Sequence, residues 1–73
     1  MRDWKKRIWT QTEWAAIQQV YALVGDEETG RAIDWAITKA RTTPSNFLTW
    51  ITEAYRILVA GKQLPSFPVE NLP

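Results

Sequence analysis

Apolar side chains recur every three or four residues from Trp14 to Val24, which is the spacing of an amphipathic helix. This pattern predicts a helix over residues 10–24. Thr10 and Glu13 lie three residues apart, as in a capping box, where two side chains satisfy the first backbone N–H groups of a helix. The helix is therefore expected to begin at Thr10.

A second helix is predicted over residues 27–41. Gly25 favours a left-handed stop for the first helix, and Asp26 is a favourable cap for the next one. The expected core face consists of Ile33, Ala36, Ile37 and Ala40. Trp35 lies almost opposite Ile33 on the helical wheel, so a single buried face leaves this tryptophan exposed.

A third helix is predicted over residues 44–60, with Thr43 as its N-cap and Pro44 in its first turn. Gly61 is expected to end it. The residues that follow contain three prolines, so residues 62–73 are expected to be extended. The pattern therefore predicts an all-α fold: a small three-helix domain within residues 10–61, a basic arm over residues 1–9 and a proline-rich tail.

The composition limits which functions are possible. A chain of 73 residues allows one small domain, in which five tryptophans enlarge the core and dimerisation would bury more surface. Cysteine and histidine are both absent, so no thiolate or imidazole is available for a metal site or for catalysis. No phosphate loop or paired-carboxylate motif occurs either. We expect a non-enzymatic, cytoplasmic protein that uses no cofactor and no metal.

Positive charge is concentrated at the amino terminus. The net charge is only +1, but residues 1–9 hold four cations against Asp3 alone. Attraction to phosphate is therefore expected to be local. A weaker basic group surrounds the turn between the second and third predicted helices. The predicted nucleic-acid-binding residues are Arg2, Lys5, Lys6, Arg7, Lys39, Arg41, Ser45, Asn46 and Arg56.

A protein partner, or a second copy of the chain, is the alternative. Large exposed aromatic side chains are favoured anchors of protein interfaces. The aromatic residues without an expected core role are Trp4, Trp35 and Phe67. A membrane partner is not predicted, because the basic arm is short and Trp9 is expected to pack against Trp14 as a hydrophobic staple.

Residues 32–55 resemble the carboxy-terminal helical module of DnaD-type replication proteins and phage replisome organisers. The resemblance rests on an Ala-Ile pair followed three residues later by another alanine in one helix, and on an aromatic, an isoleucine and another aromatic at four-residue spacing in the next. The matching residues are Ala32, Ile33, Ala36, Phe47, Ile51 and Tyr55. This resemblance implies a helical module of phage or bacterial origin that binds DNA and helps to assemble a replication complex.

Overall fold

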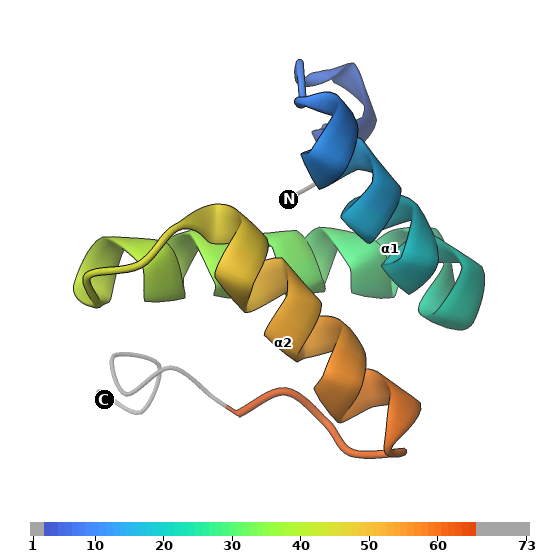
Figure 1. Cartoon of the computed structure of the whole chain (residues 1–73). Coiled ribbons are helices and arrows are strands. Elements are labelled where there is room, and N and C mark those ends of the chain that lie inside the picture. Colours follow the sequence, from blue (N-terminus) through green and yellow to red (C-terminus); the bar gives the residue numbers. More distant parts are fainter. Residues whose placement is uncertain (1–2, 66–73) are drawn as a thin grey trace, which may run out of the picture.

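The computed structural model describes residues 3–65, and all regular structure in that part is helical (Figure 1). A single 3-10 turn, η1, spans Trp4–Lys6. The long helix α1 spans Gln11–Thr42, and α2 spans Phe47–Val59. The predicted all-α class is confirmed, and no strand occurs within the described residues.

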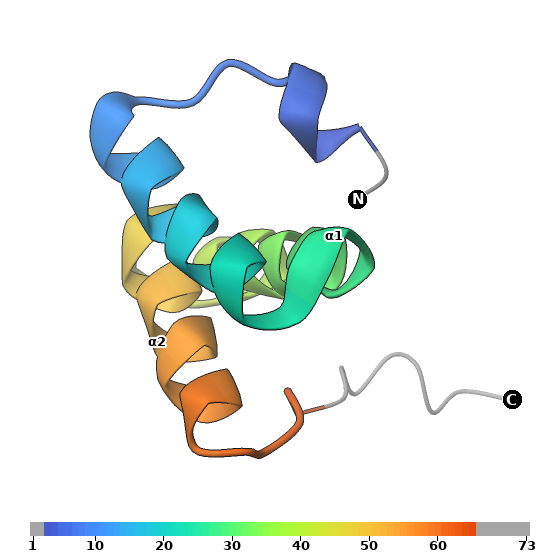
Figure 2. The same ribbon diagram turned by 90° about the vertical axis from the view of Figure 1, so that its right-hand side faces the viewer.

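The long helix α1 bends sharply at Gly25. This residue has φ 88° and ψ −175°, far from helical values, so the chain changes direction there (Figures 1 and 2). We call residues 11–24 the first limb and residues 26–42 the second limb. The predicted count of three helices is not confirmed, because one helical element covers both limbs. A single glycine redirects the chain, and no loop separates the two limbs.

The start of α1 is the one that the sequence predicts. The Thr10 hydroxyl accepts a hydrogen bond from the Glu13 backbone N–H at 3.1 Å. The Thr10 backbone N–H donates in return to the Glu13 carboxylate at 2.9 Å. Both bonds of the capping box are present, which fixes where the extended chain before Thr10 enters the helix.

Helix α2 begins at Phe47, three residues later than predicted. Thr43 is already engaged at the end of α1, where its hydroxyl donates to the Lys39 carbonyl oxygen at 2.7 Å. The Asn46 side chain takes over as N-cap by accepting from the Thr49 backbone N–H at 2.9 Å. The predicted start at residue 44 is therefore wrong, because the expected cap serves the preceding helix.

Gly61 ends α2 as predicted. It has φ 78°, and its N–H donates to the Leu58 carbonyl oxygen at 3.0 Å. The next N–H, that of Lys62, reaches back to the Ile57 carbonyl oxygen at 3.1 Å. These two bonds form a Schellman motif, which satisfies carbonyl groups that the last turn of a helix leaves without partners.

The core lies where both limbs of α1 meet α2, which runs beside the first limb and across the second (Figures 1 and 2). Small side chains on the second limb and on α2 let these segments approach closely. The fully buried core side chains are Ile17, Val20, Ala32, Ile33, Ala36, Ile51 and Ala54. Thr29 is also buried, and its hydroxyl donates to the Gly25 carbonyl oxygen at 2.6 Å, so the bend itself is braced.

After α2 the described chain continues to Pro65 without helix, and Leu64 packs against the core. The rest of the predicted tail, with Phe67, lies outside the described residues. None of the helices within residues 3–65 combines the length and the hydrophobicity that a membrane span requires.

Candidate nucleic-acid interface

The basic arm docks on the bend of α1 through Trp4. This side chain is only 3% exposed, so the predicted exposure of Trp4 is wrong. Its ring centroid lies 5.8 Å from that of Tyr21 and 6.1 Å from that of Trp14, both on the first limb. Its indole N–H donates to the Asp26 carboxylate at 3.1 Å. The bend therefore offers Trp4 both an aromatic surface and a hydrogen-bond acceptor.

Lys5 reinforces this docking. Its ammonium group lies 3.4 Å from the second carboxylate oxygen of Asp26. It also lies 5.5 Å from the Trp4 ring centroid and 5.4 Å from that of Tyr21, within the range of cation–π attraction. Lys5 is thus engaged within the protein, so its charge is less available to an external phosphate than the sequence suggests.

Removing the Trp4 side chain should release the arm without unfolding the helices. In a Trp4→Ala variant we expect trypsin to cleave after Lys5, Lys6 or Arg7 about 5–30 times faster, because losing 1–2 kcal/mol of docking raises the population of the open arm by that factor. Limited proteolysis with mass spectrometry measures this rate. The matched control is Ile8→Ala, a change at an exposed side chain of the same segment. An equal rate in wild type and Trp4→Ala would contradict the docked arm.

Trp9 ties the arm to the start of α2. Its ring stacks on Phe47 with centroids 5.2 Å apart, while the ring partner of Trp14 is Trp4. The predicted staple between Trp9 and Trp14 is therefore not seen among the described residues. The Trp9 indole N–H also donates to the Trp4 carbonyl oxygen at 2.9 Å. These contacts fix both ends of the short segment that carries Lys6, Arg7 and Ile8.

The remaining cations of the arm project outward. Lys6 and Arg7 are exposed, and neither forms an ion pair within residues 3–65. The Arg7 guanidinium carbon lies 5.0 Å from the centroid of the Trp9 ring. This contact holds the charge of Arg7 near the amino-terminal end of α2. The fourth cation of the arm, Arg2, lies outside the described residues.

A third cation, Lys39, lies over aromatic rings where α1 ends. The Lys39 ammonium lies 5.9 Å from the Trp35 ring centroid and 5.7 Å from that of Trp50. The two rings meet edge to face, with centroids 5.7 Å apart. Trp35 is only 4% exposed, so its predicted exposure is wrong: α2 covers a second side of this limb. Its indole N–H is buried without a hydrogen-bond partner.

The turn between α1 and α2 uses its polar side chains internally. The Trp50 indole N–H donates to Thr43 at 3.2 Å and also to the Ser45 hydroxyl. The Asn46 side-chain oxygen accepts from the backbone N–H and the hydroxyl of Thr49. Ser45 and Asn46, which the sequence predicts to contact nucleic acid, therefore shape the turn. These internal hydrogen bonds leave Ser45 and Asn46 fewer polar atoms with which to bind a phosphate or a base.

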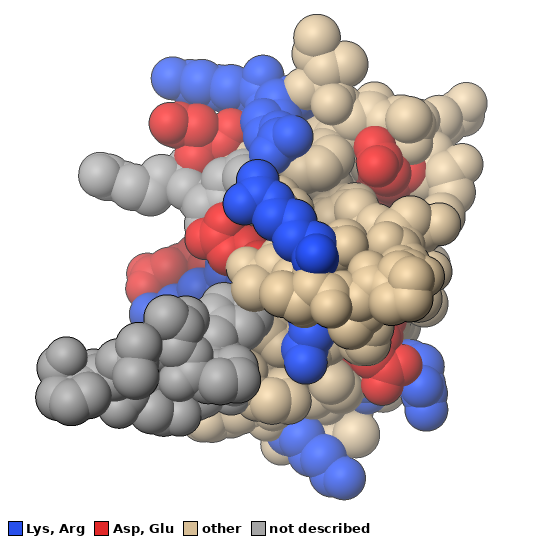
Figure 3. Space-filling model, turned by 90° about the vertical axis from the view of Figure 1, so that its left-hand side faces the viewer, with Lys and Arg blue, Asp and Glu red and all other residues tan. Residues whose placement is uncertain are grey.

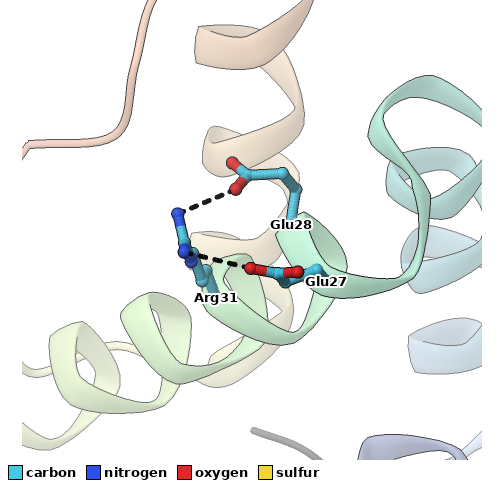
Figure 4. Close-up of polar contacts among 3 residues, drawn as sticks. All are labelled: Glu27, Glu28 and Arg31. Atoms are coloured by element: carbon cyan, nitrogen blue, oxygen red, sulfur yellow. Dashed lines mark hydrogen bonds and ion pairs between the residues drawn. The ribbon is translucent and has the colours of Figure 1, made fainter.

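Two further cations are neutralised on their own helices. The Arg31 guanidinium bonds to Glu28 at 3.0 Å and to Glu27 at 3.2 Å, within the first turns of the second limb (Figure 4). Arg56, a predicted phosphate ligand, bonds to Glu53 at 2.7 Å, one turn earlier on α2. The spacings of three and four residues that create these pairs are visible in the sequence.

The distribution of charge on the surface is mixed. Figure 3 shows the face at the end of α1, where Lys and Arg side chains are scattered from the top of the view to its lower edge, with acidic side chains beside several of them. Any contact with an anionic partner therefore depends on particular cations. Among the described residues, no cluster of acidic side chains has the composition of a metal site.

Comparisons with protein-family models, with curated proteins and with solved structures give no match. The side chains described above are therefore the basis for assigning a function.

Proposed function

We propose that this protein is a non-enzymatic module that binds the phosphates of nucleic acids, and DNA in particular. The supporting observation is that some of its cationic side chains form ion pairs with acidic side chains of the protein and others do not. Within residues 3–65, three of them form ion pairs with acidic side chains: Lys5, Arg31 and Arg56. Among the described residues, no such pair involves Lys6, Arg7, Lys39 or Arg41. These four are the phosphate ligands we propose. Lys62 is also without such a pair, but it follows the opposite end of α2.

Three of the four proposed ligands, Arg7, Lys39 and Arg41, belong to segments that meet the amino-terminal end of α2. Lys6 precedes Arg7 on the arm. The stack of Trp9 on Phe47 places Arg7 there, and Lys39 reaches Trp50 on the first turn of the same helix. Only residues 43–46 separate α2 from the end of α1, which carries Arg41 (Figure 1). A helix amino terminus is itself the positive end of the helix dipole, so it adds to the attraction for phosphate.

The aromatic rings at this site support the cations and are poorly placed to read bases. Trp9 already contacts Phe47 and Arg7, and Trp35 is buried. Base stacking requires an accessible ring face. We therefore expect contacts to the phosphate backbone with little dependence on sequence. The resemblance of residues 32–55 to replisome organisers supports DNA as the target and a role in assembling a replication complex.

The salt dependence of DNA binding tests this proposal. Four phosphate contacts on duplex DNA predict a log–log slope of about −3.6 for the association constant against salt concentration. A Lys6→Gln/Arg7→Gln variant should halve that slope, to about −1.8. Fluorescence anisotropy with labelled single- and double-stranded DNA, from low to physiological salt, measures both values.

The matched control is Arg56→Gln/Lys62→Gln, which removes the same charge at the opposite end of α2. Its slope should stay close to that of the wild type. An equal fall in both variants would show diffuse binding and would remove the assigned site. Absence of wild-type binding to any DNA at low salt would refute the proposal itself.

A protein-interaction module is the second candidate. Trp14 and Tyr21 favour it, because they lie seven residues apart on the first limb and are 37% and 43% exposed. Trp4 and Trp35, which the sequence suggested as anchors, are buried and do not support it. An interface anchored by aromatic residues should be far less sensitive to salt than phosphate binding is. The salt series above therefore separates the two candidates.

A further inference from the structure

The segment between η1 and α1 presents an apolar side chain to solvent. Ile8 is 97% exposed, although the buried Trp4 precedes it and the half-buried Trp9 follows it in the chain. We call residues 6–8 the tip. A large aliphatic side chain with almost no protein contact contributes nothing to the core, and its neighbours on the tip are the cations Lys6 and Arg7.

The tip is held in place from both sides. The Trp4 carbonyl oxygen accepts hydrogen bonds from the Arg7 backbone N–H at 3.3 Å and from the Trp9 indole N–H at 2.9 Å. Trp4 is buried against the first limb, and Trp9 is stacked on α2. The backbone is extended at Arg7 and again at Thr10, where the capping box begins. Ile8 is therefore presented by a closed, anchored loop.

We propose that Ile8 is a wedge that enters between neighbouring base pairs of duplex DNA while Lys6 and Arg7 hold the flanking phosphates. This inference rests on the phosphate binding proposed above. Proteins that kink DNA commonly insert one apolar side chain between base steps and neutralise the adjacent backbone. The tip provides both the apolar side chain, Ile8, and the neutralising cations, Lys6 and Arg7, within three residues. The wedge gives the arm a preference for base steps that unstack easily.

A base step suits this tip better than a membrane surface does. One inserted side chain is enough to open a base step, whereas stable binding at a bilayer surface needs a broad apolar face or several anchors. The adjacent aromatic residue, Trp9, is committed to Phe47 and cannot add to such a face while that stack persists.

The experiment compares two labelled duplexes of equal length and charge: one carries a central mismatched pair, which unstacks readily, and the other is an uninterrupted A-tract. Wild-type protein should bind the mismatched duplex about tenfold more tightly and bend it, as measured by energy transfer between dyes at its ends. Ile8→Ala should bind both duplexes equally with an unchanged salt slope. Ile8→Leu, which keeps an apolar wedge, should restore the preference.

The outcomes separate this inference from the proposed function. Salt-dependent wild-type binding without a preference, or a preference that survives in Ile8→Ala, would overturn the wedge and leave phosphate binding intact. Failure of the wild type to bind either duplex would overturn both. A parallel measurement uses vesicles containing anionic lipid. Loss of vesicle binding in Ile8→Ala, with both duplexes bound as in the wild type, would overturn the wedge in favour of a membrane contact.

Discussion

Replacing Ile51 with alanine is expected to lower the free energy of unfolding by about 2–5 kcal/mol. Ile51 lies in the middle of α2 and is fully buried in the core that both limbs of α1 share with α2. The substitution removes three carbon atoms and leaves a cavity that the helices fill only in part. Urea denaturation followed by circular dichroism at 222 nm measures the change.

This loss is large for so small a domain. A chain of 73 residues has a total unfolding free energy of roughly 4–11 kcal/mol. Each kcal/mol shifts the melting temperature of a domain of this size by about 4–8 °C. The Ile51→Ala variant should therefore be partly unfolded at physiological temperature.

The matched control is the same substitution at Ile8, whose side chain is exposed. Ile8→Ala should change the unfolding free energy by no more than about 0.5 kcal/mol. Similar losses in the two variants would contradict the packing of α2 on α1, because only one of these isoleucines lies in the core.

Local signals in the sequence predicted the ends of the helical segments well. Thr10 with Glu13 marked the start of α1 and Gly61 the end of α2, while Gly25, which was predicted to end a first helix, is the point at which α1 bends. All three act through hydrogen bonds or backbone angles within a few residues. The start of α2 was misplaced because Thr43 and Asn46 compete as caps. The choice depends on the hydrogen bond from Thr43 to the end of α1, which sequence alone does not reveal.

Contacts between distant residues explain the two wrong predictions of exposure. The helical wheel gives each helix one buried face, but the second limb is covered by α2 as well, which buries Trp35 against Trp50. Trp4 is buried against Trp14 and Tyr21, and Asp26, 22 residues away, accepts its indole hydrogen bond at the bend. Nothing local to the arm indicates that partner.

The same limit applies to the candidate site. The sequence supplied its cations, but Arg56 was predicted as a phosphate ligand, and it is paired with Glu53, three residues earlier on the same helix. The ion pairs of Arg31 with Glu27 and Glu28 arise from the same kind of spacing. The pairing of Lys5 with Asp26 depends on how the arm docks, so only the structure separates Lys5 from Lys6 and Arg7. The grouping of Arg7 and Lys39 around the start of α2 likewise depends on the stack of Trp9 on Phe47.

Replacing Gly25 with alanine is expected to destabilise the protein by about 1–3 kcal/mol, because a φ of 88° with a ψ of −175° lies in a region that only glycine adopts readily. Apart from the adjacent residues and the nearby backbone of the same helix, no heavy atom lies within 4 Å of the position that a Cβ would occupy, so the cost arises from the backbone angles and not from a clash with a packed neighbour. Since Asp26 follows directly, a shifted bend should also loosen the docked arm. Urea denaturation and the rate of tryptic cleavage after Lys5 measure the two effects.

Asparagine substitutions supply the control. Gly61 has φ 78° in a Schellman motif, where asparagine is tolerated, so Gly61→Asn should cost little, whereas Gly25→Asn should cost about as much as Gly25→Ala. If α1 were straight at this position, Gly25→Ala would raise the free energy of unfolding, because alanine in place of glycine stabilises a helix interior by roughly 0.5–1 kcal/mol. A stabilising Gly25→Ala would therefore refute the bend. That result would also contradict the placement of Asp26 at the bend, where it contacts Trp4 and Lys5.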